Sequence, residues 1–437
     1  MIISTLEPLR QFRQAVYQTL SPSRDAAFEI MDAIAASPTA RSAVEVSLAP
    51  TLLRNFCSLY KGIERTRIDL AQLRPWLVRE AERAGHLLID GWAVYALDHT
   101  PYPRPTAPTV RDRSYVHGAQ GVEIGHQYSL LGRVMHDTGS GVGVVDCTRI
   151  QTHHTPTEVG AQQITRLKAQ ARVPRIISAD SEYVTDQILD TADHQTRLLI
   201  RFKGNRKLDG APQRKRAGER GRRPQQGAKL KLNQVETLRP PEQSLCVAEA
   251  DGGWTVISVW ENVHVESRPH LSLCAVRVEV FAAHGQRRYK RPLWLAWSGE
   301  ASMNWASFWR IYLRRFCLEC VHQFTKNSLA WTRGRFSSTG REERWSWLVL
   351  LAYWQLLLAA PLAREVCRPW EKPTRSGTLL TPGRVQRDYL RIFWLVGSPT
   401  RPPKERGMAA GRAKGYHPLP RPRYRVVYKG KEEAVEA

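Results

Sequence analysis

Four polar residues of different chemistry recur within residues 309–333, a segment with the pattern of an α-helix. They are Tyr312, Arg315, Glu319 and Lys326. At ~100° per residue, their side chains fall within an arc of about 60° on the helix surface. One face would therefore carry a phenol, a guanidinium, a carboxylate and an ammonium group. A solvated helix face with paired charges also explains this pattern, so its interpretation depends on the rest of the chain.

The flank beside these residues is expected to be apolar and buried. It contains Leu313, Phe316, Cys320 and Phe324, which would dock the helix onto a core. Cys317 and Cys320 have the spacing of half a zinc site, but the sequence has no second CxxC pair. A helix interior is also a poor place for a zinc knuckle. We therefore expect both cysteines to take part in ordinary packing.

Two aspartates stand at the ends of predicted strands. Asp98 follows the first strand of the central region, and Asp180 follows the fourth. Sites in open α/β sheets form at the C-terminal ends of strands, so these two carboxylates could share one crevice. Nearby carboxylates compete with this assignment, namely Asp90, Asp137, Asp146, Glu182 and Asp186.

Together with Glu319, these aspartates would offer hard oxygen ligands of the kind that Mg²⁺ or Mn²⁺ prefers. Two such ions at ~3.5–4 Å can activate a water or a 3′-hydroxyl group and stabilise the leaving oxygen of an in-line phosphoryl transfer. The sequence therefore predicts a site for two divalent cations, with Asp98, Asp180 and Glu319 as ligands.

The elements that would position these carboxylates lie within residues 86–203. The predicted order is strand 86–100, strand 127–136, turn 137–140, strand 141–148, helix 155–172, strand 174–180, helix 182–193 and strand 196–203. Three antiparallel strands followed by helix-linked strands indicate an α/β fold with an RNase H-like core, a mixed five-stranded sheet with flanking helices. No GxGxxG or Walker A sequence supports a nucleotide-binding domain instead.

Four other regions flank or interrupt this core. Residues 1–85 are predicted to form a helical DNA-binding domain, with helices at 5–20, 24–36, 46–63 and 69–84. Residues 204–301 comprise a basic arm and a β-rich insertion, and 302–365 return to the core with the glutamate helix and a long apolar helix. Residues 366–437 are rich in Pro and Arg and are expected to lack structure alone and to bind DNA electrostatically.

The charge of the chain indicates a polyanionic partner. Lys and Arg number 65 against 41 Asp and Glu, which gives a net charge of +24. Nucleic acid is the first expectation and an anionic membrane surface the second. The 14 Trp and 14 Tyr residues could stack on exposed bases where they lie near basic clusters. Seven cysteines, an odd number, disfavour a disulfide framework.

One segment, 345–363, approaches the length and apolarity of a membrane span. Gln355 and Pro361 interrupt it, and no second segment of this kind exists, so a buried helix of a large core is the preferred interpretation. The N-terminal sequence lacks a charged-then-apolar signal pattern. We expect a cytoplasmic protein without a membrane partner.

With these residues in view, the sequence resembles bacterial insertion-sequence transposases of the DDE type, in the group with a Tyr-x2-Arg-x3-Glu-x6-Lys signature. Tyr312, Arg315, Glu319 and Lys326 meet every position of that signature. The resemblance extends to Asp98 as the first acid, and to Asp180 as the second. It covers residues 86–365, including the β-rich insertion between the second and third acids. The helical N-terminal region and the basic C-terminal region are only broadly similar.

The resemblance implies a role for each of these residues. Asp98, Asp180 and Glu319 would be the catalytic, metal-binding acids, with two Mg²⁺ or Mn²⁺ ions. Tyr312, Arg315 and Lys326 would contact phosphates of the DNA at the end of the mobile element. A further implied contact is an aromatic ring from the insertion stacked on a flipped base, for which Trp294 and Trp297 are the candidates. Packing within the core of the insertion is the alternative for both rings.

The resemblance also implies partners and a reaction. The substrates would be the terminal inverted repeats and a target DNA, and a homodimer would hold two ends together. Localisation at the bacterial nucleoid follows from this expectation. Two alternatives are a non-catalytic DNA-binding protein derived from a transposase and a metal-dependent nuclease without strand transfer. The presence of all three acids and the full signature favours the transposase.

Overall fold

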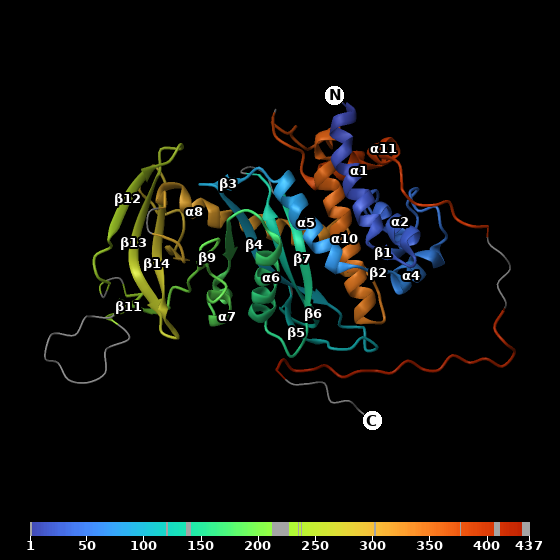
Figure 1. The fold of residues 1–437 in the computed structure, drawn as a ribbon, viewed down its shortest axis with the longest axis horizontal. Coiled ribbons are helices and arrows are strands. Elements are labelled where there is room, and N and C mark those ends of the chain that lie inside the picture. The colour runs from blue at the N-terminus through green and yellow to red at the C-terminus, as the bar shows by residue number, and fades with distance from the viewer. Residues whose placement is uncertain are drawn as a thin grey trace. The chain divides into compact units, whose positions relative to one another are not determined.

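The protein is described from a computed structural model of the 437-residue chain. The described residues are 2–118, 121–136, 141–211, 227–234, 236, 238–300, 303–375, 377–405 and 411–430. The predicted turn at 137–140 and the centre of the basic arm therefore lie outside them. The fold is mixed α/β with a large mixed sheet, as expected (Figure 1).

The chain divides into two compact units, and each is assembled from separated stretches of sequence. The first unit consists of Met1–His86, His99–Pro156 and Cys317–Ala437, and the second of Leu87–Asp98 and Thr157–Phe316. The N-terminal helices share their unit with the C-terminal region, so residues 1–85 and 366–437 are parts of one folded body.

Helix α10 (Thr339–Ala359) is the core of the first unit. It packs against α1 (Ile2–Gln18), α2 (Arg24–Ala35), α4 (Phe56–Arg65) and α11 (Pro382–Val396) (Figure 1). The helix and the turn after it are long and apolar enough to cross a membrane, but 78% of the most apolar window is buried inside the protein. Burial by neighbouring helices thus accounts for its apolar sequence, in agreement with the preferred interpretation.

Two expectations for the helical regions are wrong. The single helix predicted at 46–63 is two helices, α3 (Ala43–Val46) and α4, because Asn55 begins α4 anew by accepting a hydrogen bond from the Ser58 amide.

The C-terminal region is not uniformly unstructured, since α11 buries Val385, Tyr389 and Ile392. Its apolar residues recur at helical spacing, a signal hidden by the surrounding Pro and Arg. Helix α5 (Leu70–Ala84) agrees with the prediction.

The first unit also contains an antiparallel sheet. The first residues of β6 (Gly121–Val134) pair with β5 (Ser114–Gly118), and Gln127–Val134 of the same strand pair with β7 (Val142–Ile150). Strand β5 lies between the strands predicted at 86–100 and 127–136, where the sequence predicted no strand. A short pair, β1 (Leu20–Ser21) and β2 (Arg67–Ile68), ties the N-terminal helices together.

The second unit is built on parallel strands. The first part of β4 (Trp92–Pro103) pairs in parallel with β8 (Arg175–Ala179), and β8 pairs in parallel with β9 (Thr196–Arg201). All five residues of β8 are buried, as is typical of a parallel strand covered on both faces. Helix α6 (Pro156–Gln170) connects toward β8 as predicted.

Two details of this unit differ from the prediction. The strand predicted at 86–100 is a hairpin, because Asp90 and Gly91 adopt positive φ angles and turn β3 (Leu88–Ile89) back onto β4. The helix predicted at 182–193 is reduced to a 3-10 turn, η1 (Ser181–Tyr183), and one turn of helix, α7 (Asp186–Leu189).

The β-rich insertion extends the parallel strands. Strand β15 (Leu293–Trp297) pairs antiparallel with β9, and β14 (Arg268–Phe281) and β13 (Trp254–Val265) follow it in the sheet. The outer strands are β12 (Gln243–Ala248), β10 (Lys207–Asp209) and β11 (Lys229–Lys231). The insertion is therefore continuous with the sheet that carries the strand-end aspartates.

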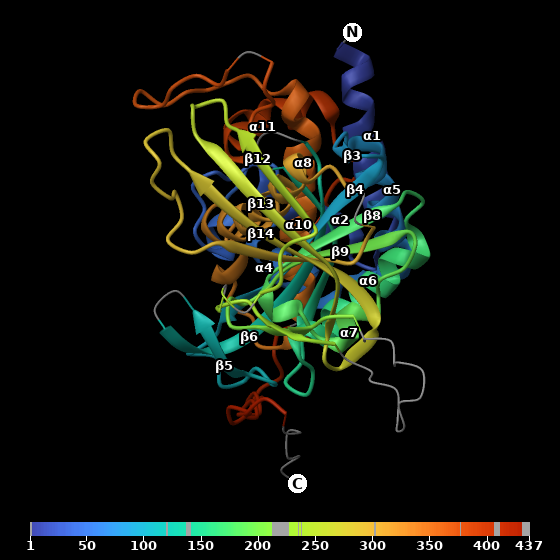
Figure 2. The same cartoon turned by 90° about the vertical axis from the view of Figure 1, so that its left-hand side faces the viewer.

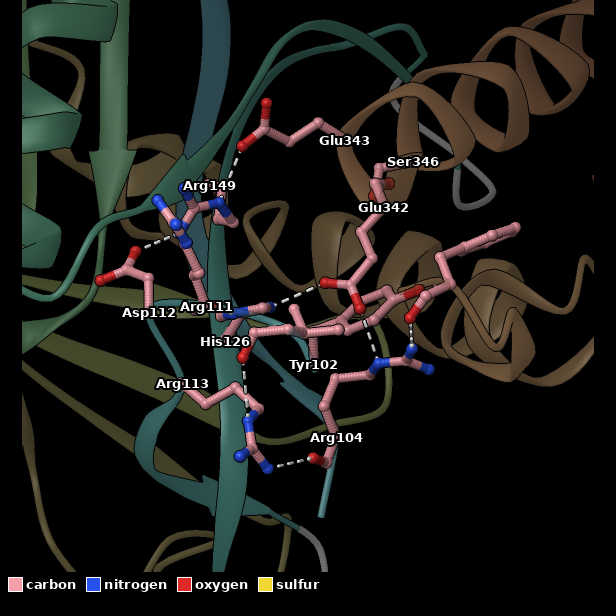
Figure 3. Close-up of polar contacts among 12 residues, drawn as sticks. Tyr102, Arg104, Arg111, Asp112, Arg113, His126, Arg149, Glu342, Glu343 and Ser346 are labelled. Carbon is pink, nitrogen blue, oxygen red and sulfur yellow. Dashed lines mark hydrogen bonds and ion pairs between the residues drawn. The ribbon is translucent and has the colours of Figure 1, made fainter. Parts of the chain in front are cut away.

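A buried polar cluster joins α10 to the strands of the first unit (Figure 3). The Glu342 carboxylate lies 2.6 Å from Arg104 Nε and 2.8 Å from His126 Nδ1. Arg104 also donates to the Phe336 carbonyl oxygen at 2.6 Å, and His126 Nε2 lies 2.9 Å from the Arg111 carbonyl oxygen. Both His126 nitrogens thus face acceptors. Breaking this network would leave buried charges without partners.

We predict that Glu342→Gln lowers the free energy of unfolding by about 3–5 kcal/mol, because it leaves Arg104 buried without its counter-charge. The neighbouring Glu343→Gln is the matched control. Its carboxylate also binds an arginine, Arg149 at 2.7 Å, but its side chain is 44% exposed against 0% for Glu342. A loss of about 1 kcal/mol or less is expected for it. Urea denaturation followed by circular dichroism measures both, and equal losses would contradict the prediction.

Candidate active site

The strand-end aspartates are neighbours in the second unit. In the parallel pair of β4 and β8, Leu97 is in register with Ala179, so Asp98 and Asp180 are the next residues on adjacent strands. Side chains at matched positions of parallel strands point to the same face. The Asp180 carboxylate also accepts a hydrogen bond from the Ser181 amide, which caps η1. Two carboxylates are thus presented together where the parallel pairing of β4 and β8 ends. Asp180 directly follows β8, but Asp98, which was predicted at a strand end, lies within β4, because β4 continues to Pro103.

Strand β9 adds a cation to this row. Ala179 is in register with Ile200, so Arg201, the last residue of β9, is at the position that matches Asp180. The Arg201 charge acts on Tyr312, which places it within electrostatic reach of the same group of residues. Sequence reasoning missed Arg201, although its position at the end of the third parallel strand was a usable signal.

Arg315 and Tyr312 lie at these strand ends. Arg315 Nη1 is 3.3 Å from Asp98 Oδ2, and the Arg315 guanidinium carbon is 5.7 Å from the centre of the Tyr312 ring. Burial raises the pKa of the Tyr312 phenol, the Arg315 charge lowers it in part, and the Asp180 charge raises it further. Tyr312 is therefore a neutral hydrogen-bond donor at neutral pH. The second unit brings together Asp98, Asp180, Tyr312 and Arg315.

The signature residues do not share one helix. The predicted helix at 309–333 is divided into α8 (Trp305–Leu313), α9 (Phe316–Asn327) and η3 (Trp331–Arg333). Arg314 and Arg315 form a tight turn, in which the Arg315 amide donates to the Tyr312 carbonyl oxygen at 3.0 Å. Tyr312 therefore ends one helix, and Arg315 occupies the junction. The single 60° face predicted from the sequence is wrong for this reason.

Glu319 and Lys326 lie on α9, in the first unit. They are separated by about two helical turns, so their side chains leave the same side of α9. Lys326 Nζ donates to Thr100 Oγ1 at 2.6 Å, and Thr100 is two residues beyond Asp98 along β4. Thr100 was not anticipated, because its pairing with Lys326 spans more than 200 residues. Asp98 and Asp180 belong to the second unit.

The buried side of α9 also differs from the prediction. Leu313 and Phe316 are exposed, whereas Cys317, Leu318 and Val321 are buried. The break at Arg314 and Arg315 changes the rotation of the second helix, so a periodicity counted through the break selects the wrong flank. Cys317 is thus a packing residue, as expected for the cysteine pair.

The two tryptophans proposed for base stacking are core residues. Trp294 is 3% exposed and packs against Trp260, with ring centres 5.2 Å apart. Trp297 is 2% exposed, and its indole nitrogen donates to the Glu300 carbonyl oxygen at 3.0 Å. This arrangement corresponds to the packing alternative, and neither ring is accessible to a base in this structure.

Asp98 and Asp180 fit part of a divalent-cation site. They offer hard oxygen donors at adjacent strand ends, and a guanidinium already binds one of them, which shows that the carboxylate attracts a cation. Within the described ranges, no group of three or more His, Cys, Asp or Glu side chains is placed to hold a metal ion. The pair alone would supply two protein ligands, and a third would have to approach from elsewhere in the chain.

We predict that Arg315→Met raises the affinity of the full chain for Mn²⁺ by about 3- to 10-fold, because it removes the cation that competes for Asp98. Asp98→Asn should lower the affinity at least about 10-fold. The control is Asp186→Asn, since Asp186 is a carboxylate of the same unit that instead pairs with Arg268 at 3.1 Å. Isothermal titration calorimetry provides the measurement, and unchanged affinity in Asp98→Asn would exclude the site.

Comparison with protein-family models and curated proteins identified no relative of this chain. No protein-family model matches the chain, and no curated protein matches its sequence significantly. The functional interpretation consequently rests on the residues at the strand ends, on the helices that follow the insertion and on the charge of the chain.

Proposed function

We propose that the protein is a DNA transposase that cuts and rejoins DNA strands at the ends of an insertion sequence by metal-dependent phosphoryl transfer. The observation that carries this proposal is the pair of aspartates at matched positions of adjacent parallel strands, where the pairing of β4 and β8 ends. Carboxylates paired in this way and surrounded by cations suit a reaction on phosphate groups.

The strand arrangement supports an RNase H-like core. In the sheet, β4 lies between β6 and β8, with β7 beyond β6 and β9 beyond β8. The strands β4, β8 and β9 are mutually parallel, whereas β6 and β7 are antiparallel. Antiparallel strands followed by helix-linked parallel strands are the order expected from the sequence.

Each residue has a role in the proposed reaction. Asp98, Asp180 and Glu319 would hold two Mg²⁺ or Mn²⁺ ions, which when bound polarise the phosphate and activate the attacking oxygen. Glu319 would supply the third carboxylate from α9. Arg315 would exchange Asp98 for a phosphate oxygen, and the neutral Tyr312 phenol would donate a hydrogen bond to the same backbone.

Lys326 and Arg201 would add positive charge for the DNA strand. Lys326 is held by Thr100 on β4, and Arg201 stands beside Asp180 at the strand ends. The net charge of +24 supports long-range attraction of DNA. The partners in this proposal are the terminal inverted repeats and a target DNA, joined by a homodimer that holds two ends.

A DNA-binding protein without catalysis is the second candidate. The ion pair between Arg315 and Asp98 favours it, because a guanidinium already neutralises one of the acids. The two candidates make different predictions for metal-dependent cleavage.

We predict Mg²⁺-dependent cleavage of a linear DNA that carries the coding region with its flanking sequences, followed by joining to a supercoiled plasmid. Asp98→Asn, Asp180→Asn and Glu319→Gln should each lower the cleavage rate at least about 100-fold, because each removes several kcal/mol of transition-state stabilisation. Their affinity for DNA should change little. Asp186→Asn, whose carboxylate pairs with Arg268, is the control and should cleave normally.

The outcomes separate the candidates. Cleavage without joining would identify a nuclease, and binding without cleavage would identify a DNA-binding protein. If Glu319→Gln cleaved as fast as the parent, the assignment of the third acid would be wrong.

A further inference from the structure

The loop between α10 and α11 presents an exposed tryptophan. Its described residues are 363–375 and 377–381, after the 3-10 turn η4 (Ala360–Leu362), and it appears in orange-red ahead of α11 (Figure 2). Trp370 is 76% exposed, far more than the core tryptophans of α10. The guanidinium carbon of Arg368 lies 5.8 Å from the centre of its ring. An indole in this position contributes nothing to the core.

The loop is nevertheless fixed to α11. Arg387 forms a two-pronged ion pair with Glu371, one contact of which is 2.6 Å, and it also donates to the Val366 carbonyl oxygen at 2.8 Å. The hydrogen bonds from Arg387 lower the pKa of Glu371 to about 2, so the pair is ionised throughout the physiological pH range. Trp370 is therefore held on a loop whose base is anchored on both sides.

A second set of contacts, made by Glu365 and Arg384, fixes the loop on the far side of Trp370. The Glu365 carboxylate accepts from the Thr374 amide at 3.0 Å and from the Thr374 hydroxyl at 2.6 Å, and Arg384 also binds it. Arg384 reaches across to the Lys372 carbonyl oxygen at 2.8 Å. The ordering entropy of the loop is thus already lost before any partner binds.

The charge that remains around Trp370 is positive. The two glutamates of the loop, Glu365 and Glu371, are occupied by the arginines of α11. The Arg368 guanidinium lies over the indole, and Lys372 and Arg375 are exposed in the same loop. A flat apolar ring among cations is complementary to a base with its phosphates, because the ring stacks on the base and the cations bind the backbone.

We propose that Trp370 binds an unpaired base of a DNA strand by stacking, with the cations of the same loop on the adjacent phosphates. This inference rests on the proposed function for the identity of the polymer, and it names a contact outside the strand-end site. A paired base is already stacked within a duplex, so the partner is a single strand or a base displaced from a duplex. An anchored loop suits this role because it presents the ring without further ordering.

The test compares binding of two fluorescent probes by anisotropy, a 30-nucleotide oligothymidine and a 30-base-pair duplex of mixed sequence. Trp370→Ala in the full chain should weaken oligothymidine binding by about 5- to 150-fold, and duplex binding should change much less. Trp370→Phe should retain most of the affinity. Because stacking involves no counter-ion release, the dependence of affinity on salt should be the same in Trp370→Ala and in the parent.

Two further variants serve as controls. Trp394→Ala removes an indole that is 62% exposed on α11 of the same unit, and it should bind oligothymidine like the parent. Arg375→Ala should reduce the salt slope for the single strand by about 0.7, the contribution of one phosphate contact. Thermal unfolding should be the same for all variants, since the replaced side chains are exposed.

The outcomes distinguish this inference from the proposed function. If Trp370→Ala binds oligothymidine like the parent while the parent cleaves DNA, the stacking contact is refuted and the transposase proposal stands. Trp370-dependent binding without any cleavage would support the contact and oppose the transposase. Absence of binding to both probes would refute both. Trp370-dependent binding to phosphatidylglycerol vesicles instead of oligothymidine would identify a membrane contact and overturn the inference.

Discussion

The parallel register of β4 and β8 is the constraint on which the chemistry of the second unit depends. It places Asp98 and Asp180 at matched positions, where two ionised carboxylates repel one another. Cationic groups relieve this repulsion, and Arg315 does so on Asp98. The continuation of the sheet through β9 and β15 fixes these strands on their other side, so the register is maintained by buried packing and the acidic pair follows from it.

The buried cluster of the first unit also pairs a carboxylate with cationic groups, but there the pairing stabilises the fold. Glu342 is fully buried, and Arg104 and His126 satisfy its carboxylate from the strands. Its side chain has no exposed surface, and we therefore assign it a structural role. Asp98 retains 16% side-chain exposure, and its partner Arg315 stands on a turn between two helices. A partner of this kind can be exchanged, which is the property that a binding site needs.

Helices and strands were predicted well from the sequence where local residue patterns determine them. The prediction failed where contacts between residues far apart in the chain determine the structure. The apolar runs of β8 and β9 and the position of Asp180 directly after β8 were evident from alternation and turn residues. Asp98 was expected at a strand end but lies within β4, which continues to Pro103. The break at Arg314 and Arg315 was not evident, because both residues favour helix and no Gly or Pro marks the interruption. The contact of Lys326 with Thr100 joins residues far apart in sequence, so no local pattern could reveal it.

The tryptophans show that solvent exposure, which the sequence does not reveal, determines which indole rings can contact a partner. Trp294 and Trp297 stand close to the predicted glutamate helix, yet strand pairing to β9 and β14 turns them into the core. Trp370 stands in a Pro- and Arg-rich stretch with no evident pattern, but ion pairs from α11 hold its loop in place. An exposed indole has an unfavourable solvation free energy that folding does not recover. A fixed loop that keeps such a ring among cations is therefore best explained by a partner that covers the ring.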